Sequence, residues 1–200
     1  MNLTTKIAAI ALASSLTAAT FAGGPGDFDA PQAFHPFSVS VNGGMNWPGV
    51  AIDGASDLFD TGYSVGGSFD YHFTPNWRAG LSVDYLSNAA SDKPSGNDLT
   101  QLLVMANGYY DFTMGKFVPY IGLGLGMVHA TIDSTFGGGA SDNYFAWAAH
   151  LGVNYMLTDQ LGLGLGYRFA VWTPPSDGDI AQASVYNNSV LANVSFHFGG

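Results

Sequence analysis

The stretch Leu161-Gly-Leu-Gly-Leu-Gly-Tyr-Arg-Phe169 alternates strictly between large apolar residues and small or polar ones. Successive side chains of a β-strand point to opposite faces, so the alternation puts Leu, Tyr and Phe on one face and Gly and Arg on the other. The stretch Pro119-Tyr-Ile-Gly-Leu-Gly-Leu-Gly126 has the same pattern. Both predict strands with one face in an apolar medium and the other face turned away from it.

The same period of two continues on both sides of these stretches. It predicts eight strands, with the fourth apolar on both faces in its first half. The predicted strands cover residues 37–47, 61–73, 77–86, 99–112, 117–129, 143–157, 161–172 and 189–198.

The connections between these strands alternate in length without exception. Three are short, at 74–76, 113–116 and 158–160, and four are long, at 48–60, 87–98, 130–142 and 173–188. Successive connections of an up-and-down barrel lie at opposite ends, which sorts short turns from long loops, as in bacterial outer-membrane barrels. A soluble β-sandwich has no reason for such sorting. The pattern predicts an all-β, eight-stranded antiparallel up-and-down transmembrane β-barrel.

The composition fits a membrane barrel. Charged residues make up 10% of the 200 residues and hydrophobic ones 47%, whereas ordinary soluble domains carry about 25% charge. No segment after the N-terminal region supplies the roughly 20 uninterrupted apolar residues of a spanning helix. The five Lys and Arg residues are scattered among 15 acidic residues, which argues against nucleic-acid binding. The absence of cysteine excludes disulfides and thiolate metal sites.

The N-terminus resembles an export signal. Lys6 precedes an apolar run over 7–16, and Thr20-Phe-Ala22 has the form of a cleavage site. We expect a signal peptide at 1–22, a flexible periplasmic lead-in at 23–36 and the barrel domain at 37–198. A short membrane anchor is the alternative, but the run is short for one.

Aromatic residues gather near the ends of the predicted strands, as in the two interfacial belts of membrane barrels. Those near the short connections are Phe73, Trp77, Phe112, Phe117, Tyr155 and Phe198. Those near the long connections are Trp47, Tyr63, Tyr85, Phe145, Trp147, Tyr167 and Phe169.

The two glycine-alternating stretches, together with the closing Asn188-Ser-Val-Leu-Ala-Asn-Val-Ser-Phe-His-Phe198, resemble the small outer-membrane barrel family, which includes opacity proteins and OmpA- and OmpX-like barrels. The resemblance covers nearly all of the chain after the export signal. It implies export to the bacterial outer membrane and specifies architecture better than activity. The family's last strand usually ends on an aromatic residue, whereas Gly199 and Gly200 follow Phe198 here.

Polar residues on the inward face predict a network inside the barrel. An eight-stranded barrel is just wide enough for side chains to fill, and buried charges need partners. We expect Arg78 and Arg168 to pair with Asp70, Asp84 or Asp111 in a structural plug, and the alternative is a narrow ion path. The predicted lumen network consists of Asp70, Arg78, Asp84, Asp111, His150, Arg168 and His197.

Neither catalysis nor a cofactor is expected. The glycines of 122–126 and 162–166 lie within strands and no helix follows, unlike a dinucleotide fingerprint; we expect them to leave room for Tyr120, Arg168 and His150. His129, Thr131 and Asp133 lack the spacing and the supporting motif of an activated nucleophile.

The long connections are acidic. Their acidic residues are Asp53, Asp57, Asp60, Asp92, Asp98, Asp133, Asp142, Asp177 and Asp179, against the single basic residue Lys93. Carboxylates suit divalent cations, which could bridge these loops to lipopolysaccharide, although no EF-hand-like spacing is present. The sequence favours an envelope structural protein that contacts membrane lipid, lipopolysaccharide and a surface ligand or host partner through these loops. A narrow porin-like channel for small solutes or ions is the alternative.

Overall fold

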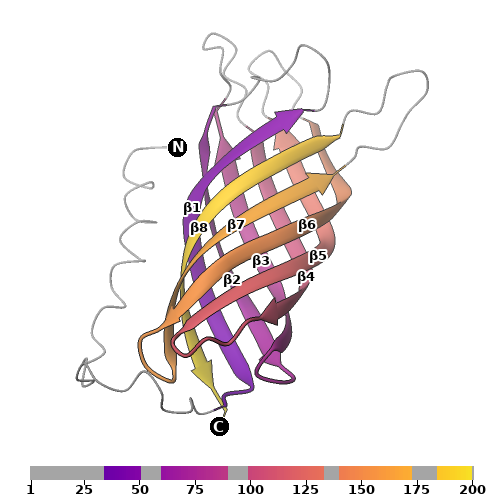
Figure 1. Cartoon of the computed structure of the whole chain (residues 1–200). Helices are drawn as coiled ribbons and strands as arrows, with labels where there is room; N and C mark the ends of the chain where they lie inside the picture. Colours follow the sequence, from indigo (N-terminus) through magenta and orange to yellow (C-terminus); the bar gives the residue numbers. More distant parts are fainter. Residues whose placement is uncertain (1–33, 51–59, 90–98, 133–139, 173–183, 200) are drawn as a thin grey trace.

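The structure is a closed barrel of eight antiparallel strands, as predicted (Figure 1). The computed structural model describes residues 34–50, 60–89, 99–132, 140–172 and 184–199. Each strand pairs with its neighbours in the chain, and the first pairs with the last. The strands are β1 (Phe37–Val50), β2 (Gly62–His72), β3 (Trp77–Asn88), β4 (Leu99–Asp111), β5 (Phe117–Ile132), β6 (Ala140–Met156), β7 (Leu161–Trp172) and β8 (Val185–Phe198).

Several strands reach beyond their predicted bounds at the end with the long connections. β5 extends to Ile132, β6 begins at Ala140 and β8 begins at Val185. Backbone pairing continues there through polar sequence, because a ladder needs only N–H and C=O groups. Apolar alternation marks the part of a strand that faces lipid and therefore underestimates its length.

The short connections lie together at the opposite end. In two of them a threonine hydroxyl accepts hydrogen bonds from two backbone N–H groups: Thr74 from Asn76 and Trp77, at 3.3 and 3.0 Å, and Thr158 from the N–H groups two and three residues later, at 3.2 and 2.9 Å. Such bonds replace backbone partners in a tight turn. In the third, Gly115 has φ of 62°, a conformation that favours glycine.

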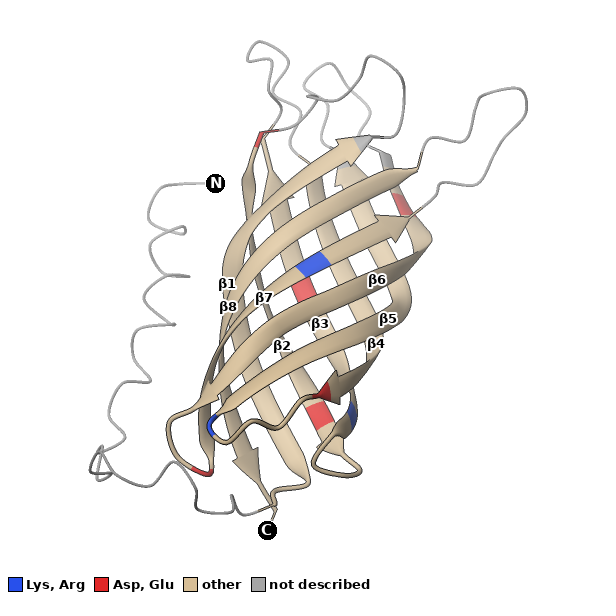
Figure 2. Cartoon of the chain, in the orientation of Figure 1, with Lys and Arg blue, Asp and Glu red and all other residues tan. Residues whose placement is uncertain are grey.

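The wall of the barrel is apolar on its outer face. Its largest exposed side chains include Leu81, Leu123 and Leu163, at 62, 68 and 43% exposure. The charged residues of the described ranges lie in the interior or toward the ends of the strands, and the wall between them carries none (Figure 2). The described residues contain no helix long and apolar enough to cross a membrane. The outer face thus suits hydrocarbon, where every strand must find its backbone partners within the protein.

The predicted aromatic belts are present at both ends of this wall. Near the turns, Trp77 packs edge-on against Tyr110, with ring centroids 4.9 Å apart, and Phe37 of β1 stacks on Phe198 of β8 at 5.8 Å. At the other end, Trp147 and Phe169 lie 5.9 Å apart.

Inward glycines lie across the sheet from large inward side chains. Gly66 is the register partner of Asp84, Gly80 of Asp70 and Gly122 of Tyr109. A Cβ atom at any of these glycines would overlap the side chain opposite it. Gly152 and Gly166 make room for Tyr120, as predicted for that residue, whereas Gly122 and Gly124 make room chiefly for Tyr109 and Asn107. Small residues therefore decide where large ones fit in the narrow interior.

Gly126→Ala should destabilise the barrel by about 1–3 kcal/mol, the usual cost of overpacking. Its Cβ would overlap the Val104 carbonyl of β4 and lie 2.8 Å from Met105 Cα. Gly108→Ala is the matched control, since nothing lies within 4 Å of a Cβ there. Urea unfolding in lipid vesicles measures both changes in the free energy of unfolding, and equal effects would contradict this packing account.

Candidate functional site

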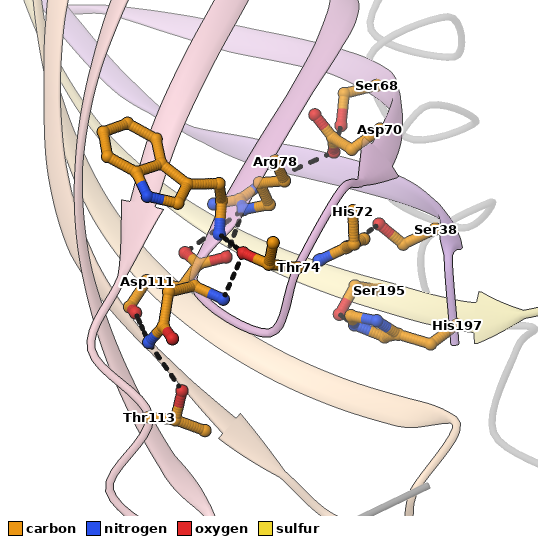
Figure 3. Close-up of polar contacts among 12 residues, drawn as sticks. Ser38, Ser68, Asp70, His72, Thr74, Arg78, Asp111, Thr113, Ser195 and His197 are labelled. Atoms are coloured by element: carbon orange, nitrogen blue, oxygen red, sulfur yellow. Dashed lines mark hydrogen bonds and ion pairs between the residues drawn. The ribbon is translucent and has the colours of Figure 1, made fainter. Parts of the chain in front are cut away.

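Arg78 is the centre of a polar cluster near the turns (Figure 3). Its Nε lies 2.9 and 3.2 Å from the two carboxylate oxygens of Asp111, and its Nη1 lies 3.5 Å from Asp70 Oδ2. Its guanidinium carbon lies 3.9 Å from the centre of the Tyr109 ring. β2, β3 and β4 are neighbours, so their inward residues near one end converge on this cation. The cluster ties three adjacent strands together.

Arg168 makes a separate ion pair, which crosses the lumen. Its Nη1 lies 2.6 Å from Asp84 Oδ2, and its Nη2 lies 3.4 Å from Ser64 Oγ. Arg168 belongs to β7 and Asp84 to β3, which lie on opposite sides of the barrel. The residues are only 2% and 1% exposed, so the pair is buried between the two facing walls of the barrel.

A buried apolar cluster lies in the half of the lumen near the long connections. Leu103 and Trp172, at 2% and 4% exposure, are among its largest members. We call this cluster the apolar seal; it consists of Leu86, Leu103, Met105, Val128, Ala146, Ala148, Ala170 and Trp172. Next to it, Asn46 Nδ2 donates a 2.7 Å hydrogen bond to Asn88 Oδ1. Sequence reasoning noted that the first half of β4 is apolar on both faces but did not predict a seal.

The other half of the lumen contains a polar cavity of about 400 Å³. Its lining includes the turn residues Pro75, Thr113 and Asp159 at one end and Arg168 with Leu191 deeper inside. It thus runs from the short turns to the transluminal ion pair, with the apolar seal beyond. We call it the vestibule.

The histidines of the predicted network lie beside these ion pairs and make other contacts. His150 packs edge-on against Tyr109, with ring centroids 5.4 Å apart. His197 Nε2 lies 3.3 Å from Ser195 Oγ, and the His197 ring lies 5.3 Å from that of His72. The structure therefore places all seven predicted lumen residues inside the barrel and brings five of them into ion pairs.

Two of the acidic residues predicted for the long connections belong to the described residues. The backbone N–H of Asp60 donates a 2.9 Å hydrogen bond to the carbonyl of Ala89, and exposed Asp142 accepts one from the Tyr144 hydroxyl at 3.4 Å. Outside the described residues lie the predicted signal peptide, the predicted lead-in up to residue 33, and the other seven acidic residues, Asp53, Asp57, Asp92, Asp98, Asp133, Asp177 and Asp179.

Around His129, the described residues do not form a group that could activate a nucleophile. Its Nδ1 lies 3.0 Å from Asn143 Oδ1 on β6, an exposed contact between neighbouring strands, and Asp133 lies outside the described residues. Within the same ranges, no three His, Cys, Asp or Glu residues gather as metal ligands would.

Comparison with known proteins identifies what this architecture is similar to. A family model described as "Outer membrane protein beta-barrel domain" matches residues 8–198. Outer membrane protein PagN of Salmonella typhimurium is 29% identical over 154 residues, which are 64% of this chain and 62% of PagN. The chain thus spans less than two thirds of that relative's length.

Solved structures share the fold at low identity. Neisserial surface protein A superposes with a TM-score of 0.61 at 22% identity, covering 82% of this chain and 97% of that one. OprG of Pseudomonas aeruginosa gives 0.57 at 18% identity, covering 84% and 99%.

Arg168→Met should destabilise the barrel by about 3–5 kcal/mol, because it leaves the buried Asp84 carboxylate without its cation. The double change Arg168→Met with Asp84→Asn removes both charges and should recover at least half of that loss. Unfolding of the four proteins in a double-mutant cycle measures the coupling. A double variant no more stable than the single one would contradict a pairing role for Arg168.

Proposed function

Because the chain belongs to the outer membrane protein beta-barrel domain family and resides in the bacterial outer membrane, we propose that it acts as a structural and surface-interaction protein of the cell envelope. In this proposal the barrel anchors the protein in the membrane, and the four acidic connections make the contacts outside the cell. Short turns of such barrels face the periplasm and long connections face outward.

The observation that carries the proposal is the closed outer half of the lumen. An ion entering from the periplasm would meet first the Arg168–Asp84 pair and then the apolar seal, whose members are at most 4% exposed. Stripping water from an ion in apolar surroundings is strongly unfavourable without compensating partners. A filled barrel contributes to function through what it holds at the surface.

A narrow channel is the second candidate, and the vestibule is the observation in its favour. About 400 Å³ of polar cavity already connects the turns with the middle of the barrel. Conduction would require both the Arg168–Asp84 pair and the apolar seal to move aside. We favour the anchoring role because the seal is built from strand residues of the barrel wall, several of them fixed in ladders on both sides.

The acidic connections define the kind of contact that we propose. Eight of the chain's 15 acidic residues lie in them, against Lys93 alone, and Asp142 lies among the first residues of β6. Such a surface would attract cationic partners and divalent cations, which could bridge it to the anionic groups of lipopolysaccharide. We assign no catalytic step to the chain.

The refolded protein should give no conductance steps in a planar bilayer, with folding checked by the heat-dependent shift on a gel. Leu103→Ala with Trp172→Ala should introduce steps, because it removes two of the largest side chains of the seal. The control is Leu102→Ala with Val171→Ala, which truncates the adjacent outward residues of the same strands. Reproducible steps from the unaltered protein would support the channel instead.

A further inference from the structure

Two histidines come together at the turn end of the vestibule, beside the strands that close the barrel. His72 is the last residue of β2, His197 is the last but one of β8, and β1 runs between these two strands. Their rings nevertheless lie only 5.3 Å apart, inclined at 48° (Figure 3). Neighbouring strands are about 4.8 Å apart, so β2 and β8 are separated by roughly 10 Å. Both side chains therefore lean over β1 toward each other.

The residue of β1 between the two histidines is small. Ser38 is buried and is the register partner of His197. The backbone N–H of His72 donates a 2.7 Å hydrogen bond to the carbonyl of Pro36, two residues before Ser38. The two histidines thus flank β1 at nearly the same height in the barrel. A serine between them leaves the space in which their rings converge.

Serine hydroxyls hold both imidazoles by the same nitrogen. Ser38 Oγ lies 3.0 Å from His72 Nε2, and Ser195 Oγ lies 3.3 Å from His197 Nε2. An imidazole whose Nε2–H donates to such an oxygen has its lone pair on Nδ1. Histidines that ligate metals are usually oriented by a hydrogen bond of this kind at their other nitrogen. In that form each ring presents Nδ1 as its metal-binding atom.

The separation of the rings suits a shared metal ion. A metal–nitrogen bond of about 2.0–2.1 Å, continued by about 1.1 Å to the ring centre, places each ring centre about 3.2 Å from the metal. Two imidazoles at a tetrahedral angle then have their centres about 5 Å apart. The centres of the His72 and His197 rings, 5.3 Å apart, fit this arrangement.

The charge next to the histidines favours a cation. Arg78 is the register partner of His72, but its guanidinium lies 2.9 Å from Asp111 and 3.5 Å from Asp70. One positive charge beside two carboxylates leaves this cluster with a net charge of −1. Buried charge needs compensation, which a bound cation would supply. Because His72 and His197 line the vestibule, an ion can reach them from the turn end.

We propose that His72 and His197 bind one divalent transition-metal ion, which links β2 to β8 across β1. Imidazole suits Zn²⁺, Ni²⁺ and Cu²⁺, and Cu²⁺ binds most tightly in the usual order of affinities. No third His, Cys, Asp or Glu of the described ranges gathers with them as a ligand, so water completes the coordination. β1 and β8 close the barrel, and the ion would fasten this closure. The inference goes beyond the proposed surface role and does not depend on it.

The test uses the refolded protein without an affinity tag, in phosphatidylcholine nanodiscs, with Zn²⁺ as the probe. Competition with a fluorescent chelator should show one ion per barrel and at least tenfold weaker binding for His72→Gln and for His197→Gln. His129→Gln is the matched control, because His129 is exposed at the opposite end of the barrel. It should bind Zn²⁺ as the unaltered protein does. The heat-dependent shift on a gel confirms that each variant has folded.

Two further readouts test the ligands and the link between strands. Electron paramagnetic resonance of the Cu²⁺ form should show hyperfine structure from two imidazole nitrogens, and from one in His197→Gln. Saturating Zn²⁺ should raise the urea midpoint of the unaltered barrel, because an ion that binds only the folded state stabilises it. The same Zn²⁺ concentration should leave the midpoint of His197→Gln unchanged.

The contrary outcomes are distinct. Equal binding by the unaltered protein and all three variants would mean adventitious binding and would overturn the site, as would the absence of bound ion at micromolar Zn²⁺. Binding through both histidines without a rise in the urea midpoint would overturn the link across β1. None of these results bears on the surface-interaction role, because the long connections at the other end are unaltered.

Discussion

Closing eight strands into a barrel leaves an interior that side chains must fill, and the other features of this protein follow from that constraint. Hydrocarbon outside requires each strand to pair on both sides, so the sheet closes. The narrow interior then admits large side chains only opposite small ones, as Tyr109 lies opposite Gly122. Arginines there must meet carboxylates, because unpaired charges would be strongly unfavourable. Arg168 and Asp84 satisfy this requirement across the full width of the lumen.

The filling differs between the two halves of the lumen, and this asymmetry bears most directly on function. Toward the periplasm the interior contains the vestibule, whereas toward the outside it is filled by the apolar seal and by buried polar side chains such as Asn46, Asn88 and Gln101. A lumen that is closed at its outer end suits a membrane anchor better than a channel.

The barrel could be predicted from the sequence because apolar residues at every second position indicate one structure, a strand with one apolar face. The sequence also placed Arg78 and Arg168 on the inner face, but it left their partners open. Asp84 lies on the same strand as Arg78 yet pairs with Arg168 four strands away, which depends on the stagger of the closed sheet. The seal was not predicted because three of its eight members are alanines, such as Ala146 and Ala170, and an inward alanine by itself does not indicate an apolar cluster. The extra length of β5 and β6 was missed because a polar stretch that pairs its backbone resembles a loop.

The central claim is that the lumen is open to the periplasm and closed to the outside. The most direct test is to measure from which face of the membrane a reagent can modify a thiol inside the lumen. The chain has no cysteine, so Asn193→Cys introduces a single thiol on the vestibule wall. A membrane-impermeant methanethiosulfonate reagent is added to either face of vesicles that hold the barrel in one orientation. Reaction from the turn face alone is the result that this account predicts. Reaction at similar rates from both faces would mean a continuous water path and would contradict it.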